Sequence, residues 1–244
     1  MSSAPGINEA RYSRHRELIS LGQWERLCSM RVVVAGAGGL GAHVMDTLAR
    51  LAPMQIEIWD PARLDAPDLN RQTLYVQTDL GQLKVEAAKR RLQNINPALT
   101  VECQAKTIDS ASTLGDLIGG VDACFDCLDS FAARTALEAA LIHSVQRFNK
   151  RTAIPLFHGG VSGYFGQAAM LLPPDYGYTR FFGPRFSEIP DSPKAVMPFS
   201  VAMVAATQVS LFIKWLTGSD APNLRAELVA VNSMDNTAEV IEIL

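Results

Sequence analysis

The stretch Arg31-Val32-Val33-Val34-Ala35-Gly36-Ala37-Gly38-Gly39-Leu40-Gly41 decides the expected fold. A short apolar, β-branched run predicts a buried strand, glycines follow in the pattern G-x-G-x-x-G, and residues 42–51 have helical character. Strand, glycine turn and helix N-terminus together form a cradle for phosphate, because glycines let the backbone approach the ligand and the helix presents free N–H groups to negative charge. The alternative is a glycine turn that only packs the helix against the sheet.

An acidic residue at a suitable distance favours nucleotide binding by this turn. Asp60 ends a second predicted strand, residues 56–60, and follows Gly41 by 19 residues. A separation of roughly 20 residues is typical of an acid that binds a ribose. We therefore expect a nucleotide on the glycine turn, although the turn alone identifies neither the nucleotide nor the reaction.

Composition narrows the class of protein. A chain of 244 residues can bury a large core, and one α/β domain of this length is ordinary. Lys plus Arg number 22 against 25 Asp plus Glu, so the net charge of −3 gives no reason to expect nucleic acid as the main ligand. The four cysteines show no disulfide-framework spacing, and residues 1–10 lack the features of a signal peptide, so we expect a cytoplasmic protein.

Strands and helices alternate along most of the chain. The expected order is a leading helical segment over 11–28, strands over 31–35, 56–60, 100–105, 121–128 and 154–158, and helices over 42–51, 82–95, 112–118 and 131–148. This alternation predicts an α/β fold with a Rossmann-like, mostly parallel sheet and helices on both faces. Residues 164–172 look like a strand with no helix before it, and 227–231 with 239–243 like a hairpin, so we expect an antiparallel C-terminal continuation.

Two C-terminal segments need separate treatment. Residues 173–198 hold six of the 13 prolines and five aromatic residues, which predicts an ordered loop that crosses a surface without regular structure. Residues 199–216 are mostly apolar and approach the length of a membrane span, but they contain polar residues, so we expect a helix buried in the core or in a subunit interface, and no membrane segment. We assign residues 1–244 to one domain.

A set of charged residues falls at the expected nucleotide end of the sheet. It comprises Arg14, Arg71 with Gln72, Lys84 and Asp129. Cations neutralise phosphate oxygens, and a carboxylate can hold Mg²⁺, which prefers oxygen ligands and bridges phosphates. The set therefore suits a triphosphate with Mg²⁺ better than a nicotinamide cofactor, which would need its own hydride-transfer site.

Each of these residues also has an ordinary structural explanation. Arg71 would be a surface charge, and Lys84 a solvated residue, although a cation in the first turn of a helix opposes the helix dipole unless an anion lies nearby. Asp129, or equally Ser130, would cap the helix that starts at residue 131. Asp126, which precedes Asp129 by three residues, is more simply structural than catalytic.

The arrangement resembles the MoeB/ThiF/HesA family, bacterial relatives of the ubiquitin-activating enzymes. The matching pieces are Arg11-Tyr12-Ser13-Arg14, Gly36 to Gly41, Asp60, Asp68-Leu69-Asn70-Arg71-Gln72, Gly81-Gln82-Leu83-Lys84, Asn96-Pro97, Asp126-Cys127-Leu128-Asp129-Ser130 and Gly163-Tyr164-Phe165-Gly166-Gln167. Each piece is short, but their order and spacing extend over more than 150 residues.

The resemblance implies an ATP-dependent adenylyltransferase. In that reaction the C-terminal Gly-Gly carboxylate of a small ubiquitin-like sulfur carrier attacks the α-phosphate of ATP, giving an acyl-adenylate and pyrophosphate. The roles it implies are nucleotide binding for Gly36, Gly38, Gly39, Gly41, Asn70 and Gln72, ribose binding for Asp60, triphosphate binding for Arg71 and Lys84, Mg²⁺ coordination for Asp129, and a reach into the other subunit of a homodimer for Arg14. Adenylation of a peptide or tRNA-bound carboxylate, a nucleotide-binding scaffold with little turnover, and an NAD-dependent oxidoreductase remain alternatives.

Three departures from the family pattern carry expectations of their own. Many members hold a structural zinc with two C-x-x-C pairs, whereas this sequence has no cysteine after Cys127, and Cys124 and Cys127 would point to opposite faces of a strand; we expect no structural zinc. The crossover-type loop 173–198 lacks the cysteine that forms a thioester or persulfide in some relatives, so the adenylate should pass directly to another nucleophile. Asp68 stands where the family usually has Asn, and its charge should repel phosphates unless it helps to bind Mg²⁺.

Overall fold

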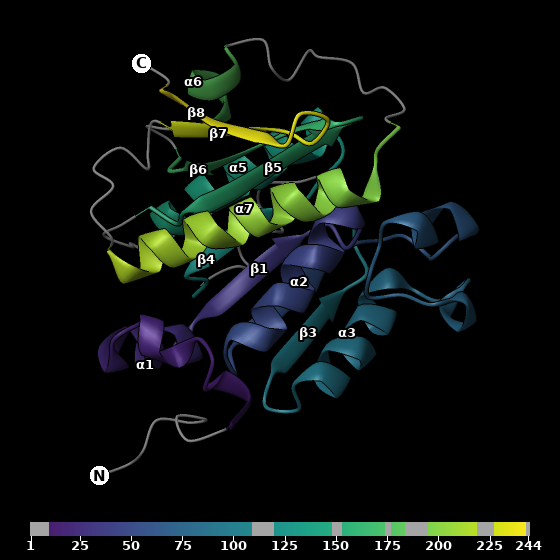
Figure 1. Cartoon of the computed structure of the whole chain (residues 1–244), viewed down its shortest axis with the longest axis horizontal. Coiled ribbons are helices and arrows are strands. Elements are labelled where there is room, and N and C mark those ends of the chain that lie inside the picture. The colour runs from purple at the N-terminus through teal and green to yellow at the C-terminus, as the bar shows by residue number, and fades with distance from the viewer. Residues whose placement is uncertain are drawn as a thin grey trace.

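One mixed sheet organises the protein. The computed structural model describes residues 10–108, 120–147, 153–173, 177–183, 195–218 and 227–242. The strands are β1 (Arg31–Ala35), β2 (Gln55–Trp59), β3 (Thr100–Gln104), β4 (Ala123–Asp126), β5 (Leu156–Ser162), β6 (Phe165–Leu171), β7 (Glu227–Asn232) and β8 (Thr237–Glu242). They pair in the order β3-β2-β1-β4-β5-β6-β7-β8, parallel as far as β5 and antiparallel from β5 onward (Figure 1). The predicted Rossmann-like sheet with an antiparallel continuation is confirmed.

Helices cover both faces of the sheet, as predicted. They are α1 (Leu21–Ser29), α2 (Gly39–Leu51), α3 (Lys84–Ile95), α5 (Phe131–Arg147), α6 (Tyr178–Phe182) and α7 (Pro198–Thr217), with short 3-10 helices η1 (Ala10–Tyr12), η2 (Arg16–Leu18), η3 (Ala66–Asn70) and η4 (Gln77–Asp79). One core cluster takes side chains from α1, α2, α3 and α7, and the other from α5 and α6.

Strand β1 shows why its sequence is continuously apolar. Val32 and Val34 belong to the first cluster and Val33 and Ala35 to the second, so both faces of the strand are buried. A strand buried on both faces has no position at which a polar residue is favoured. Parallel pairing of β1 with β2 and with β4 places the carboxyl ends of these strands at one edge of the sheet, where the cavity described below lies.

The long apolar helix α7 belongs to the core. Among the described residues, α7 is the one helix that is long and apolar enough to cross a membrane. Half of its apolar 18-residue stretch is buried inside the protein. Phe212 packs its ring 5.4 Å from that of Phe125 and 5.5 Å from that of Phe157. In Figure 1, α7 runs beside α2 and across β5 and β6. The expectation of a core helix is confirmed.

The leading helical segment is divided into short helices. Residues 11–28 form η1, η2 and most of α1, and the apolar residues Leu18 and Leu21 are 83% and 50% exposed. The reason is a capping box, in which the Ser20 hydroxyl accepts a hydrogen bond from the Gln23 N–H and the Gln23 side chain accepts one from the Ser20 N–H. The capping box therefore starts α1 at Leu21.

The crossover-type segment 173–198 also differs from expectation, because it contains the short helix α6. Tertiary contacts hold this helix: the Tyr178 N–H donates to the Glu138 carboxylate at 2.8 Å, and the Tyr178 hydroxyl donates to Asp126. Residues 174–176 and 184–194 of the segment, and the predicted helix over 112–118, lie outside the described residues.

Candidate active site

The glycine turn requires glycine at two positions. Gly36 has φ +96°, and a Cβ there would lie 2.6 Å from the carbonyl oxygen of Cys127. A Cβ at Gly41 would lie 1.9 Å from the carbonyl oxygen of Gly36, so a side chain would separate helix from turn. The turn therefore brings the first N–H groups of α2 to the carboxyl edge of the sheet, as the sequence predicts.

A cavity of about 740 Å³ opens at this edge. It gathers most of the predicted site residues from separate segments: Gly36, Gly38, Gly39, Asp60, Arg71, Lys84 and Asp129. The remaining ones do not line it: Gly41, Asn70, Gln72 and Arg14. Arg14 is exposed on the leading segment and does not line the cavity of its own chain.

Asp60 is fixed directly on the glycine turn. One carboxylate oxygen accepts a hydrogen bond from the Ala37 N–H and the other from the Ala62 N–H, both at 2.8 Å. Each oxygen keeps a lone pair, since a carboxylate accepts about four hydrogen bonds. The carboxylate can therefore accept further hydrogen bonds from two neighbouring hydroxyl groups, such as those of a ribose.

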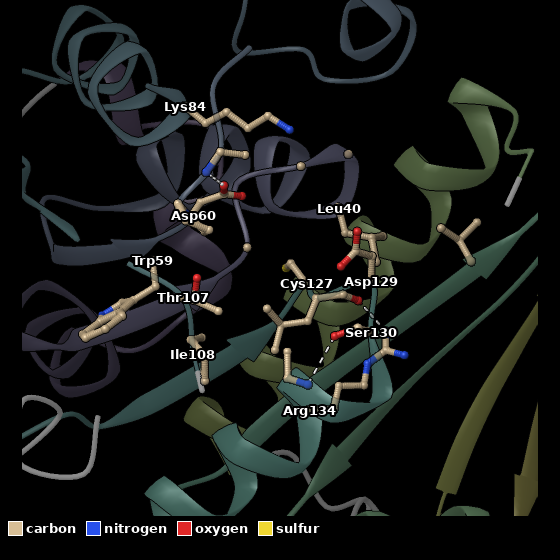
Figure 2. Close-up of a pocket in the computed structure, with 18 of the residues that line it drawn as sticks. Leu40, Trp59, Asp60, Lys84, Thr107, Ile108, Cys127, Asp129, Ser130 and Arg134 are labelled. Carbon is tan, nitrogen blue, oxygen red and sulfur yellow. Dashed lines mark hydrogen bonds between the residues drawn. The ribbon is translucent and has the colours of Figure 1, made fainter. Parts of the chain in front are cut away.

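One wall of the cavity is largely apolar, and the sequence did not single it out. Trp59, Thr107 and Ile108 stand together on one side in Figure 2, and Leu128 adds to the lining. The Trp59 indole N–H donates to Glu57 at 2.9 Å, and Glu57, 2% exposed, pairs with Arg31 at 2.6 Å. The rule that ligands bind beyond the ends of parallel strands applies to β3 as well, and it would have pointed to residues 106–108.

Two cations border the opposite part of the cavity. The Arg71 guanidinium donates to the Pro67 carbonyl at 3.1 Å and to the Asn70 side chain at 2.8 Å, so Asn70 orients Arg71 without lining the cavity. Lys84 is the first residue of α3 and is 8% exposed. Its ammonium lies 3.2 Å from a carboxylate oxygen of Asp68, which supplies the anion that a cation at a helix N-terminus needs.

Asp129 is exposed at the cavity and is free to bind a cation. Helix α5 does not need it as a cap, because the Ser130 hydroxyl accepts a hydrogen bond from the Ala133 N–H at 3.2 Å (Figure 2). Within the described ranges, no group of three or more His, Cys, Asp or Glu side chains could hold a metal ion. A single carboxylate fits Mg²⁺ bound together with phosphates, since this ion keeps several waters and needs only one or two protein carboxylates.

A second acid, Asp126, lies below the cavity in a saturated network. Its carboxylate accepts hydrogen bonds from Leu128 N–H, the Arg134 guanidinium and Tyr178, and contacts the His158 ring at 2.6 Å. Burial alone would raise the pKa of Asp126, but Arg134, His158 and Tyr178 together lower it to about 2. Burial lowers the pKa of His158. Asp126 is structural, as expected, and it fixes the turn that carries Asp129.

The two closely spaced cysteines face apart, as predicted. Cys124 packs in the cluster with α5 and Cys127 in the cluster with α2, so they cannot share a metal ion. Cys127 borders the cavity, but burial raises the pKa of its thiol well above the ordinary value. A thiol that stays protonated is a poor nucleophile.

Fold and cavity together define a class: an α/β protein whose nucleotide-type glycine turn shares a cavity with cations and a free carboxylate. The chain belongs to the ThiF family, whose sequence profile matches residues 12–243. The resemblance stated from the sequence is confirmed, and with it the enzyme class, since the relatives named below are adenylyltransferases or an activating enzyme.

Three named relatives cover different shares of the chain. The SAMP-activating enzyme E1 of Haloferax volcanii is 30% identical over 239 residues, 95% of this chain and 84% of that protein. A sulfur carrier protein adenylyltransferase of Thermus thermophilus is 31% identical over 162 residues, 66% of this chain and 56% of that protein. The molybdopterin-synthase adenylyltransferase of Salmonella typhimurium is 37% identical over 116 residues. This last match covers 47% of this chain and 46% of that protein, so the chain spans about half the length of two of these relatives.

Solved structures agree on the fold. The crystal structure of E. coli MccB with ATP superposes with a TM-score of 0.78 at 19% identity, covering 99% of this chain and 73% of that chain. The crystal structure of PaaA gives a TM-score of 0.77 at 21% identity, covering 100% of this chain and 76% of that chain. At these identities the likeness extends to the fold alone.

Proposed function

We propose that the protein uses ATP to activate the C-terminal carboxylate of a small ubiquitin-like sulfur carrier that ends in Gly-Gly, as an acyl-adenylate. The observation that carries this proposal is one cavity in which the glycine turn, Asp60, Arg71, Lys84 and Asp129 meet from separate segments. Relatives named for SAMP, for a sulfur carrier protein and for molybdopterin synthase support a carrier as the substrate and sulfur transfer as the pathway.

The cavity suggests how the chain would hold ATP. The apolar wall with Trp59 would take the base, Asp60 the ribose hydroxyls, and the first N–H groups of α2 the phosphates. Arg71 and Lys84 would neutralise the triphosphate oxygens. Mg²⁺, when bound at Asp129, would neutralise phosphate charge that builds up on the leaving pyrophosphate.

The reaction needs positioning and charge stabilisation more than proton transfer. A carboxylate oxygen of the carrier forms a bond to the α-phosphorus while the bond from that phosphorus to the bridging oxygen breaks, and pyrophosphate leaves with the electron pair. The attacking carboxylate is already ionised near neutral pH, so no general base is required. Arg71 and Lys84 act by stabilising the developing negative charge.

We infer a homodimer in which Arg14 reaches the cavity of the partner subunit. Arg14 is exposed and lies away from the cavity of its own chain, and the apolar side chains of Leu18 and Leu21 are exposed on the same segment. A second subunit on this segment would cover both leucines and add a cation to the site. Sedimentation of the full chain, and of Leu18→Glu/Leu21→Glu, tests this inference; a monomeric wild type would refute it.

Further expectations from the sequence remain proposals. We infer that residues 1–244 form a single adenylation domain, as the family match over 12–243 supports. We also infer a cytoplasmic protein with no structural zinc and neither nucleic acid nor membrane as its main ligand; the net charge of −3 supports the absence of nucleic acid. Stoichiometric zinc in protein purified without added zinc would overturn the inference about the metal.

Two assays test the proposed reaction. Exchange of pyrophosphate into ATP distinguishes an enzyme from a nucleotide-binding scaffold. Incubation with ATP, Mg²⁺ and each candidate Gly-Gly carrier, followed by mass measurement, should show one added AMP on the carrier. An adduct only on a peptide or on a tRNA-bound carboxylate would replace the carrier by that substrate, and a thiol-sensitive link between protein and carrier would contradict direct transfer of the adenylate.

A further inference from the structure

Asp68 sits at the centre of the contacts around Lys84. One of its oxygens lies 3.2 Å from the Lys84 ammonium and accepts a hydrogen bond from the Asp65 N–H at 3.1 Å. The other accepts a hydrogen bond from the Gln72 side chain at 2.6 Å. The side chains of Asp68 and Lys84 are 15% and 11% exposed, so water screens this pair only weakly.

Lys84 therefore faces the cavity and at the same time forms an ion pair with Asp68. It lines the cavity, whereas Asp68 does not, and the carboxylate contacts the ammonium from outside the cavity. An ammonium has three donors, so Lys84 can contact a phosphate while it stays near Asp68. However, the attraction that Lys84 offers to a phosphate is reduced by the negative charge 3.2 Å away.

The compensation by Asp68 acts on one of several cations at the cavity. Arg71, Lys84, Lys106 and Arg134 line it, and Asp60 and Asp129 are its carboxylates. A free polyphosphate, which carries several negative charges, is attracted less by Lys84 than it would be by an ammonium without Asp68 beside it. A divalent cation that arrives with the polyphosphate reduces this loss, because it lowers the negative charge of the ligand and is itself attracted by the carboxylates.

Gln72 helps to hold Asp68 beside Lys84. Gln72 is 2% exposed, and its side-chain amide donates to Asp68 at 2.6 Å. The same amide nitrogen lies 4.0 Å from the position of a Cβ on Gly38, beside the phosphate-binding turn, although Gln72 does not line the cavity. The Asp68 carboxylate is therefore held by Gln72 through one oxygen and by the Asp65 N–H through the other.

We propose that Asp68 is a specificity-determining residue of the nucleotide site: it holds and partly neutralises Lys84, so that the cavity binds polyphosphate as its complex with a divalent cation and discriminates against the free anion. This inference rests on the proposed function. It differs from that function in what it predicts, because it concerns the cation dependence of binding and not whether adenylation occurs.

Calorimetric binding of inorganic tripolyphosphate, and of the α,β-methylene analogue of ATP, to the full chain tests the proposal. Each probe is titrated in EDTA and in excess Mg²⁺. For the wild type we expect binding at least about tenfold tighter with Mg²⁺ than without it. In Asp68→Asn, binding without the cation should tighten by about tenfold while binding with Mg²⁺ changes little, so that the ratio collapses.

Three further variants make the result specific. Glu86→Gln removes one exposed negative charge from the first turn of α3 and should leave the ratio within about twofold of the wild type. Asp68→Ser should repeat the effect of Asp68→Asn if the latter fails to fold. In Lys84→Met/Asp68→Asn the gain in cation-free affinity should vanish relative to Lys84→Met, because the gain acts through the ammonium.

The outcomes separate the two proposals. An unchanged ratio in the folded Asp68 variants, weaker binding under both conditions, or binding of neither probe by any variant would overturn the role of Asp68. Wild-type pyrophosphate exchange together with an unchanged ratio would leave the adenylyltransferase in place and remove only this role. A collapsed ratio without any exchange would support Asp68 and contradict the proposed reaction.

Discussion

Two carboxylates three residues apart have opposite surroundings. Asp126 is fully buried and uses both oxygens in contacts with Leu128, Arg134, His158 and Tyr178. Asp129, one turn of chain further on, is exposed at the cavity and accepts no hydrogen bond from a described residue. The difference separates a structural acid from a ligand-binding one. An acid whose oxygens are all used in contacts within the protein holds the backbone in place, whereas an acid with unused acceptors can bind a ligand.

The largest expected effect is the loss of stability when Asp126, the buried acid of this pair, is removed. Asp126→Ala should lower the free energy of unfolding by roughly 3–5 kcal/mol, because it leaves Arg134 buried without its partner. Denaturant unfolding followed by circular dichroism measures the change. Asp129→Ala is the matched control and should alter stability by less than about 0.5 kcal/mol. Equal losses in the two variants would contradict the distinction.

The exposed member should show the reverse pattern. Asp129→Ala and Lys84→Ala should each reduce pyrophosphate exchange by about 10²–10³-fold, since each removes one group that stabilises charge in the transition state. Lys89→Ala, on the same helix but absent from the cavity lining, is the control for loss of a cation. Wild-type exchange rates in both test variants would remove the proposed mechanism.

Acid should weaken the buried network around Asp126. The folded-state pKa of Asp126 is lowered from 3.8 to about 2, so its contribution is present above pH 4 and is lost as pH falls toward 2. That contribution is about 2 kcal/mol. The pKa of His158 is also lowered, by burial, so unfolding takes up a proton below pH 6.5 and stability falls there too.

Unfolding free energies of the wild type and of Asp126→Ala, measured between pH 7 and pH 2, check this prediction. The wild type should lose stability in both ranges. The variant should lack the loss between pH 4 and pH 2. A variant whose curve parallels that of the wild type below pH 4 would contradict the assignment of that step to Asp126.

The sequence predicted those parts of the fold that depend on the pattern of neighbouring residues. The apolar run and the glycines of residues 31–41 predicted the first strand, the turn and the following helix. The rule that ligands bind beyond the ends of parallel strands predicted that Asp60 and Asp129 would line one site, and both line the cavity. Lys84 was predicted at the site, but the anion beside it is Asp68, which the sequence suggested as a source of repulsion toward phosphates or as a help in binding Mg²⁺, and not as the partner of Lys84. Local patterns give the place of a charge along the chain; its partner depends on folding.

What the sequence missed depends on long-range contacts. Tyr178 reaches Asp126 across 52 positions, and that contact anchors α6 inside a proline-rich segment. Strand β5 was expected over 154–158 but runs over Leu156–Ser162, because pairing with β6 extends it. Trp59 falls inside the strand predicted over 56–60, and nothing in the local sequence shows that an indole at a strand end borders a cavity.

The smallest predicted effect concerns Glu57, an acid that shares one property with Asp126 and one with Asp129. Glu57 is buried and saturated like Asp126, but the indole that it holds, Trp59, borders the cavity like Asp129. If the apolar wall takes the base, Trp59→Phe removes contact made equally in the ground and transition states, so KM for ATP should rise about three- to tenfold with little change in kcat. Trp215→Phe, which packs beside Arg26 away from the cavity, should change neither constant. A fall in kcat at unchanged KM would mean that Trp59 positions the reacting groups. Glu57, which holds Trp59, would then contribute to catalysis although it is a buried acid with both oxygens in use, and burial alone would no longer separate structural acids from functional ones.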